Sequence, residues 1–310
     1  MRKKTYKRTI QKFQIWDVCM VLCIMMILPV NISLFFLKEE QSEKVVVEKS
    51  ILDSGLEWQV LHELAAVIPP EYEIETLKAQ AVILRTNILA ESRKEEKNIQ
   101  NLKKQGVPLL SAYKEKWGEN YDANCKNLFK AVSETKGMYL QREDEPIRVS
   151  YFRLSNGNTR SGEECLGVDF AVFGTKECKK DLLNEKFIQK IKIVGKRFAE
   201  KISHIVGKEV SYEYLKASDI TYDYDSTGYV LGVKLGDIKL GGEVLREALG
   251  LPSSDFSITY EEKNVLFETK GMGSGIGFCQ YGANEMAKEG KDFIELLNYF
   301  FTNIAISKTE

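Results

Sequence analysis

The sequence predicts an α+β fold, in which helices and antiparallel strands form separate parts of one chain. Apolar residues recur at helical intervals in Leu56–Val67 and again between Glu73 and Arg93. By contrast, Ser218–Leu240 alternates apolar with polar residues and is interrupted by glycine-containing turns, which favours an antiparallel meander. Because the strands come in hairpins and the helices are segregated from them, we do not expect a doubly wound parallel sheet.

The start of the chain has the pattern of a membrane anchor. Residues 1–14 form a basic tail, and residues 15–37 are apolar apart from a few scattered positions. This run provides the ~20 residues that a membrane-spanning helix needs, and its basic flank favours a cytoplasmic N-terminus. A cleaved signal peptide usually has an apolar core of only ~7–15 residues and small residues at the cut site. We therefore expect an uncleaved, single-pass signal anchor in the cell membrane, then a stalk over residues 38–53 and an extracytoplasmic domain over residues 54–305.

Composition argues against nucleic-acid binding and against a metal site. A net charge of −1 gives no strong attraction for nucleic acid, so we expect no nucleic-acid partner. Cysteines beyond the apolar run would lie where disulfides persist. Cys165 and Cys178 are the nearest pair and could form a bridge, although Cys125 and Cys279 allow other pairings and the sequence does not choose. The chain has only two histidines, neither near these cysteines, so we predict no zinc site and no other metal or cofactor.

The first part of the domain is expected to be mainly helical. Leu56–Val67 forms the first helix, which Pro69-Pro70 ends. The second helix runs from about Glu73 to Arg93, and its acidic start suits the positive end of the helix dipole. A polar, loop-rich stretch over residues 94–125 then leads into a short helix over Cys125–Glu134.

The middle of the chain is expected to begin with two strands, Met138–Leu140 and Arg148–Phe152, joined by an acidic turn. Ser155–Thr159 follows as a turn, because its residues tolerate positive φ. We predict a helix over residues 182–206, with these apolar positions: Phe187, Ile191, Phe198 and Ile202.

The last part of the chain is expected to mix strands with short helices. After the meander, Glu243–Leu249 is predicted to be a short helix that ends at Gly250. We predict a strand at Val265–Thr269 and a helical run over Asn284–Phe301. The stretch from about residue 180 to 260 could form an inserted subdomain.

The segment Gly271–Ala283 is the most informative stretch of the chain. Its first four glycines fall at every second position and precede the predicted helical run. Glycine has no Cβ, so this spacing suits a loop whose backbone closely approaches a ligand or another strand. We expect the loop to bring its amides and the side chains of Gln280 and Tyr281 to a cleft. A glycine-rich turn beside a buried tyrosine explains the glycines equally well.

Three segments, in the right order, resemble the stage II sporulation protein D family. Glu75–Thr86 is similar to the family's helix E-A-L-K-A-Q-A-V-A-A-R-T, and Ser155–Thr159 is similar to its S-x-G-x-T turn. The third segment, Gly271–Ala283, is similar to G-x-G-H-G-V-G-M-S-Q-Y-G-A. In addition, Gly228–Leu249 is similar to a family stretch that ends in l-R-x-x-L-G. The resemblance extends from about residue 50 to 305.

The resemblance implies a protein that acts on peptidoglycan. Members of the family cleave glycan strands as lytic transglycosylases, alongside an amidase that removes stem peptides. In spore formers they act in engulfment together with a membrane partner. The implied location is the mother-cell membrane, with the C-terminal domain facing the septal wall.

The residue expected to carry catalysis is replaced in this chain. The family's glutamate stands just before a Met-Pro ahead of the second helix, and the matching position here is Val67. Glycoside cleavage needs a carboxylic acid to protonate the leaving oxygen, and valine cannot provide one. Glu63, one turn earlier, and Glu71, just past the prolines, are the nearest substitutes. Both are also read as solvated or dipole-pairing carboxylates.

The resemblance also implies a set of glycan-binding residues. Two family histidines are replaced, one by Ser274 in the glycine loop and one by Phe152 before the Ser155 turn. Lys78 and Arg85 lie two turns apart and share a helix face, although spacing alone fits solvated cations equally well. The full predicted set is Lys78, Arg85, Ser155, Gly157, Ser274, Gln280 and Tyr281.

Three functions remain open from the sequence. The chain could be a divergent lytic transglycosylase that uses Glu63 or Glu71. It could be a catalytically degenerate module that grips glycan strands or activates the amidase. The third alternative is a membrane-anchored scaffold with no role in sugar binding, since a fold does not fix a function.

Overall fold

The computed structural model describes residues 55–94 and 109–309. All of them belong to one compact unit, residues 51–310. Within these ranges no helix has both the length and the apolar character needed to cross a bilayer. The predicted basic tail, apolar run and stalk lie outside the described residues, so the membrane anchor stays a prediction. Helices and mainly antiparallel strands share the unit, which confirms the predicted α+β class.

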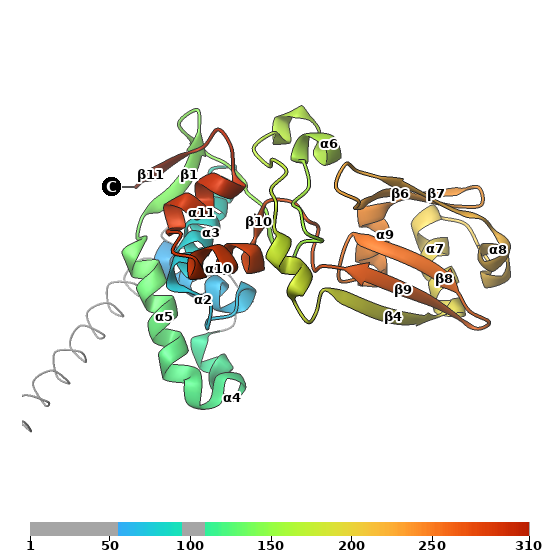
Figure 1. Ribbon diagram of the computed structural model, residues 1–310, viewed down its shortest axis with the longest axis horizontal. Coiled ribbons are helices and arrows are strands. Elements are labelled where there is room, and N and C mark those ends of the chain that lie inside the picture. The colour runs from blue at the N-terminus through green and yellow to red at the C-terminus, as the bar shows by residue number, and fades with distance from the viewer. Residues whose placement is uncertain (1–54, 95–108, 310) are drawn as a thin grey trace, which may run out of the picture. The chain divides into compact units, whose positions relative to one another are not determined.

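Three packed helices form the first part of the unit, as predicted (Figure 1). Their apolar faces meet in a common core, in which Leu64, Leu77 and Leu128 are fully buried. The first helix ends at Val67, after which Ile68 still donates to the Leu64 carbonyl before the prolines intervene. The helices are α2 (Gly55–Val67), α3 (Ile74–Lys94) and α5 (Tyr121–Glu134).

A small sheet beside these helices joins the middle of the chain to its end. In it β1 (Met138–Arg142) pairs antiparallel with β2 (Glu145–Pro146) and with β11 (Ala305–Lys308). The acidic turn between β1 and β2 is confirmed: Glu143 and Asp144 both have positive φ, as a two-residue hairpin turn requires.

The second predicted strand, Arg148–Phe152, is correct only over its last two residues. They form β3 (Tyr151–Phe152), which pairs in parallel with β10 (Phe278–Cys279). This short ladder fixes the end of the glycine loop beside the middle of the chain.

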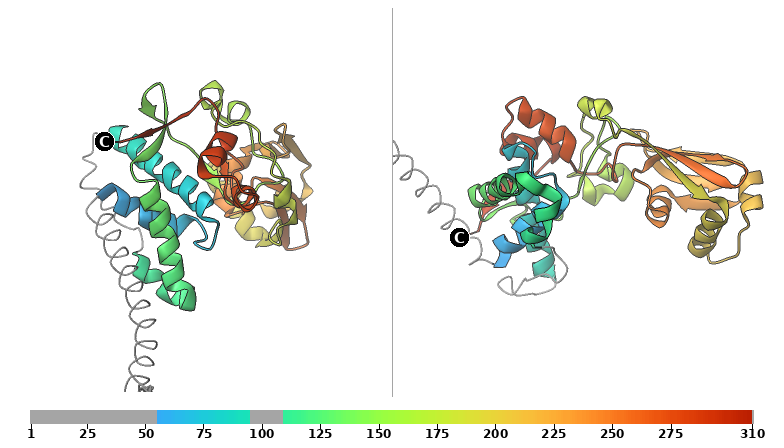
Figure 2. Two further views of the ribbon diagram at one scale, coloured as in Figure 1. Left: turned by 60° about the vertical axis from the view of Figure 1, so that its left-hand side comes forward. Right: turned by 90° about the horizontal axis from the view of Figure 1, so that it is seen from below.

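A second group of elements surrounds its own hydrophobic cluster, which includes Phe198, Val233, Leu245 and Phe267. Helix α7 packs against β4 and β9, α9 packs against β6 and β7, and the two helices contact each other (Figures 1 and 2). The predicted meander and the short helix after it are confirmed. One sheet has the order β4-β9-β8 and the other β5-β6-β7. Their strands are β4 (Ile188–Val194), β5 (Ile220–Tyr224), β6 (Val230–Leu235), β7 (Ile238–Gly241), β8 (Asp255–Tyr260) and β9 (Asn264–Lys270), and the helices are α7 (Gly195–Val206), α8 (Tyr212–Ala217) and α9 (Gly242–Leu249).

The helix predicted over residues 182–206 is wrong in its first half. Residues 188–194 are strand β4, and the helix begins only at Gly195. Along β4 exposure alternates: Ile191 and Ile193 are half-buried, whereas Lys190 and Lys192 are exposed. A period of two places one side of a strand against the core. Pairing with β9 therefore makes this segment a strand, although its apolar residues also fit helical spacing.

The single helical run predicted over Asn284–Phe301 is two helices. These are α10 (Gln280–Lys288) and α11 (Phe293–Phe300). Gly290, at φ +95, breaks the run, because this left-handed conformation strains any residue with a Cβ. Asp292 then caps α11 in a capping box with Glu295.

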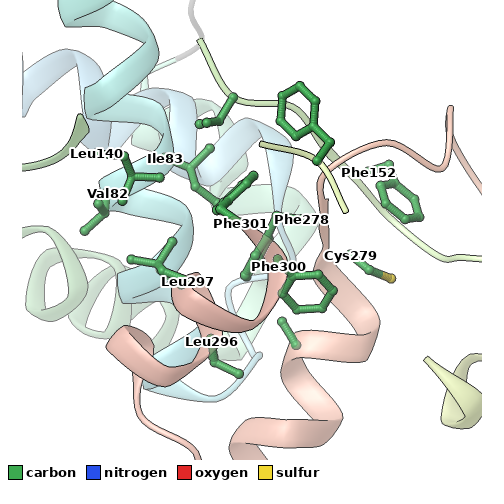
Figure 3. Close-up of a cluster of buried hydrophobic side chains, with 14 of the residues drawn as sticks. Val82, Ile83, Leu140, Phe152, Phe278, Cys279, Leu296, Leu297, Phe300 and Phe301 are labelled. Carbon is green, nitrogen blue, oxygen red and sulfur yellow. The ribbon is translucent and has the colours of Figure 1, made fainter. Parts of the chain in front are cut away.

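The C-terminal helices close the first hydrophobic cluster (Figure 3). Phe278, Phe300 and Leu297 pack there against Val82 and Ile83 of α3. Short helical turns complete the described ranges: η2 (Leu110–Tyr113), α4 (Lys114–Trp117), η3 (Gly118–Asn120), α6 (Gly162–Leu166), η4 (Val168–Phe170) and η5 (Lys179–Leu183).

The possible bridge between Cys165 and Cys178 is not formed, and both residues are thiols. Cys165 lies in α6 with its Sγ 3.5 Å from an Asp225 carboxylate oxygen. Cys178 lies against Gly282 of α10 instead. The two cysteines are near neighbours in sequence, but they pack against different elements.

Candidate functional site

A pocket of about 450 Å³ opens beside the glycine loop. Its walls combine the end of α2, strand β3, the glycine loop and helix α9, so it draws on segments far apart in the sequence. It is lined by Val67, Tyr151, Phe152, Arg153, Arg246, Pro252, Met272, Gly273, Ser274 and Gln280.

Backbone contacts hold the glycine loop against this pocket. Met272 and Leu154 each donate a backbone hydrogen bond to the other, at 2.7 and 3.1 Å, and Gly273 donates to the Pro252 carbonyl at 2.7 Å. A Cβ on Gly273 would lie 2.6 Å from the Cβ of Phe152, and φ there is +116°. The alternating glycines therefore allow close backbone approach, as the sequence predicts, and the loop forms one wall of a pocket.

Val67 and Gln280 meet at the wall. The Gln280 amide donates to the Val67 carbonyl at 3.1 Å and to the Gln80 side-chain oxygen at 3.0 Å. Gln280 is almost fully buried, and among the described residues nothing donates a hydrogen bond to its Oε1. A buried acceptor of this kind is normally satisfied, so Oε1 is an exception in the core beside the pocket.

No lining residue carries a carboxylate. Glu63 lies one turn before Val67 and accepts a hydrogen bond from Gln59 at 2.7 Å. Burial raises the pKa of Tyr151 in the pocket wall, and the charge of Glu63 raises it further. Glu71 is exposed, and its charge raises the pKa of Tyr72, which is not part of the pocket lining. Glu63 is therefore the substitute carboxylate that is coupled to the pocket.

Two arginines give the pocket its charge. Arg153, just after β3, is exposed, and Arg246 of α9 pairs with Glu243 and Glu247. A guanidinium group offers a planar set of donors that matches carboxylates. Neither residue is in the predicted set. Arg246 could have been found, because it is the arginine of the matched l-R-x-x-L-G stretch, whereas Arg153 had no sequence signal.

Lys78 and Arg85 are predicted site residues that the structure does not bring to the pocket. Arg85 is fully buried and holds both carboxylate oxygens of Glu57, at 2.6 and 2.8 Å. Lys78 bonds Glu75 at 2.8 Å and Glu134 at 2.5 Å. Burial opposes the charge of Lys78, but these carboxylates outweigh it and raise its pKa. Both cations join helices to neighbouring elements.

The remaining predicted residues divide between the pocket and its support. Ser274 lines the pocket together with Gln280. Ser155 is buried, and its backbone donates to Asp181 at 2.7 Å while its hydroxyl accepts from the Gly157 amide at 3.0 Å. Tyr281 is outside the lining, and its amide donates to the Arg153 carbonyl at 3.0 Å. Ser155, Gly157 and Tyr281 therefore contribute to the backbone structure around the pocket and not to its lining.

Known proteins resemble the chain over most of its length. Residues 49–141 match the family model described as stage II sporulation protein. Stage II sporulation protein D of Bacillus amyloliquefaciens is 29% identical over 269 residues, which cover 84% of this chain and 76% of the relative. The Bacillus subtilis (strain 168) protein of the same name is 28% identical over 270 residues, with 84% and 77% covered. An uncharacterized protein of Brachyspira hyodysenteriae is 25% identical over 285 residues, with 88% and 71% covered.

The family match covers α2, α3 and α5, and the alignments with the two Bacillus proteins reach well beyond it. Two of the segments whose resemblance was noted in the sequence, Gly271–Ala283 and Gly228–Leu249, contribute residues to the pocket lining, whereas Glu75–Thr86 and Ser155–Thr159 do not. The family match and these identities support a divergent member of the stage II sporulation protein D family.

Proposed function

We propose that this protein binds peptidoglycan glycan strands in the pocket during sporulation and does not cut them from the position of the family's glutamate. One observation carries the proposal: Val67 lies in the wall of a pocket whose lining has no carboxylate. The alternating glycines and Gln280 keep part of that wall similar to the family pattern, whereas Ser274 replaces a family histidine.

The loss of cleavage follows from the chemistry. A general acid must lie within hydrogen-bonding distance of the leaving oxygen. A carboxyl group displaced by as little as ~1 Å can lower the rate ~100-fold. Val67 offers only methyl groups at this position, so the bond to the leaving sugar stays intact.

The capacity to bind follows from the groups that remain. Glycan strands carry hydroxyl, acetamido and carboxylate groups. Arg153 and Arg246 supply donors for carboxylates. Tyr151 and Phe152 add aromatic surface for a sugar face. The volume of about 450 Å³ is in the range of small-ligand sites.

A second candidate function is lytic transglycosylase activity with Glu63 as the general acid. Its support is the electrostatic coupling of Glu63 to Tyr151 in the pocket wall. In both cases the proposed setting is the mother-cell membrane, with residues 15–37 as the anchor and with an amidase and a membrane protein as partners.

One assay separates the two candidates. The full chain is incubated with denuded glycan strands, and the products are analysed for 1,6-anhydro sugar ends. We expect the strands to sediment with the protein and no new ends to form. Ends that form with the wild type and disappear in Glu63→Gln would establish the enzyme instead. Absence of both binding and new ends would contradict the two candidates together.

A further inference from the structure

Two buried thiols and a buried carboxylate converge beside the end of the glycine loop. They belong to Cys178, Asp181 and Cys279, and their sulfur and oxygen atoms all lie within 4.8 Å of one another. We propose that these three residues bind a thiophilic divalent cation of the zinc class. The inference does not depend on glycan binding.

The three residues come from two separate parts of the chain. Cys178 directly precedes η5 and Asp181 lies within it, so a tight helical turn places both on one side. Cys279 ends β10, one residue before Gln280 and α10. In Figure 3 Cys279 lies at the edge of the apolar cluster, with its sulfur directed away from the aromatic rings. Its Sγ is 2.9 Å from Asp181 Oδ2.

Asp181 has an unsatisfied oxygen at this place. The residue is fully buried, and its Oδ2 accepts hydrogen bonds from the Ser155 amide and the Cys279 thiol. Among the described residues no donor reaches Oδ1. A buried carboxylate oxygen without a partner is costly, whereas a cation in contact with it would satisfy it.

Gly282 keeps space beside the same atoms. A Cβ there would lie 3.0 Å from Cys178 Sγ and 3.2 Å from Asp181 Oδ1. Any side chain at this helical position would therefore press on both donor atoms. The missing Cβ leaves these atoms facing bare backbone, next to the unsatisfied oxygen.

The cluster borders an open pocket. A second pocket, of about 190 Å³, is lined by Cys178, Asp181 and Gly282, and by the acidic residues Glu285, Glu289 and Glu177. Lys179 and Lys180 also line it, but each is paired with one of these glutamates. A cation can enter here, and a water molecule from this pocket can complete the coordination.

The donor set decides the class of cation. Two sulfurs and one carboxylate oxygen suit Zn²⁺, which favours four ligands and accepts thiolate and carboxylate together. Magnesium and calcium prefer oxygen ligands only. On binding, the thiol protons pass to water and two thiolate–metal bonds form, without transfer of electrons. The cation would tie η5 to the start of α10 and so hold Gln280 in position.

The test uses the full chain, reduced and freed of metal. Zn²⁺ is titrated against a chromogenic chelator, and Co²⁺ is used as a spectroscopic probe because thiolate ligation gives an intense near-ultraviolet band. We expect one ion per chain, a rise in Tm, and the thiolate band. Cys279→Ser should weaken Zn²⁺ binding by at least about 100-fold and remove most of the band. Cys165→Ser, a cysteine outside the cluster, should change neither.

Three results would overturn the inference. One is the absence of stoichiometric Zn²⁺ binding by the wild type. Another is an affinity for Zn²⁺ equal to that of the wild type in both Cys279→Ser and Asp181→Asn, the second of which keeps the shape of the carboxylate. The third is a Cys178–Cys279 disulfide in the chain isolated without reductant, detected by mass spectrometry. Circular dichroism of each variant without metal checks folding, and the Co²⁺ band of the wild type tests the site even if a variant unfolds.

Discussion

Val67 is the residue on which the functional proposal depends. It stands where the family has a glutamate, and the structure places it in the pocket wall with its carbonyl bonded to Gln280. The resemblance in the sequence therefore singled out a position that lies in the pocket lining. It did not identify Arg153, which enters the pocket only because β3 pairs with β10.

A single substitution at Val67 should restore cleavage. Val67→Glu places a carboxyl group at the wall beside Gln280, where general acid catalysis typically contributes ~100- to 10,000-fold. We expect 1,6-anhydro ends to rise at least about 100-fold above the wild-type background. Val67→Gln has the same shape without the acid and serves as the control. Equal yields from the two variants would contradict the placement of the reacting bond at Val67.

The cysteine cluster shows why some sites cannot be predicted from sequence. The prediction of no zinc site relied on the distance of the histidines from the cysteines, and a bridge between the nearest cysteines was one of several possible pairings. Cys178 and Cys279 lie far apart in sequence and meet through the packing of η5 on α10. Because Asp181 is one of many acidic residues, nothing in its local sequence marks it.

At the level of elements, the sequence predicts helices with a clear apolar stripe and strands with local turns. The first two helices, the meander and α9 meet these conditions and are confirmed. Strand β4 was predicted as helix because Ile191, Phe198 and Ile202 also fit helical spacing. Its partner β9 is about seventy residues away, so the pairing that decides its conformation leaves no local signal.

The two cations predicted to bind glycan should differ in their effect on stability. Arg85→Ala leaves the Glu57 carboxylate buried without its main partner, which should lower the free energy of unfolding by about 3–5 kcal/mol. Lys78→Ala removes ion pairs to partly exposed glutamates and should cost about 1 kcal/mol or less. Urea denaturation followed by circular dichroism measures both. A larger loss of unfolding free energy in Lys78→Ala than in Arg85→Ala would contradict the stronger stabilising role of the buried Arg85 ion pair.

The ion pair of Arg160 with Asp225 should make stability depend on pH. It is buried, at 2.5 Å, and Arg160 also donates to the Ser274 carbonyl, so it joins the β5–β6 turn to the glycine loop. Burial alone would raise the pKa of Asp225, but the hydrogen bond and charge of Arg160 outweigh it and the pKa lies below the ordinary 3.8. Such a carboxylate stabilises the fold above its unfolded pKa, and this contribution is lost as pH falls through the folded value.

Asp225→Asn should therefore destabilise the protein at neutral pH, with a deficit that shrinks as pH falls below about 4. Free energies of unfolding of both proteins, measured across this range, give the deficit. Asp255→Asn is the control with the opposite trend, because burial raises the pKa of Asp255. A deficit for Asp225→Asn that is constant with pH would show that the pair does not have the expected charge.

At the level of the whole molecule, the pocket joins segments that the alignment alone leaves separate. The glycine loop runs from β9 of one hydrophobic cluster to β10 of the other, and the pocket has walls from both groups of elements. The sequence predicted a cleft at this loop, but it assigned the cationic wall to Lys78 and Arg85. In the structure Arg153 and Arg246 line the pocket instead, so we predict that these two arginines bind the glycan strand.

The most direct measurement is the affinity of the full chain for fluorescently labelled, denuded glycan strands. If the pocket holds the strand, the Arg153→Ala, Arg246→Ala double variant should bind at least about 10-fold more weakly, since each arginine offers charge-assisted hydrogen bonds. Arg148→Ala, which removes an exposed arginine outside the lining, should bind like the wild type. Unchanged affinity in the double variant, or an equal loss in Arg148→Ala, would contradict binding in this pocket.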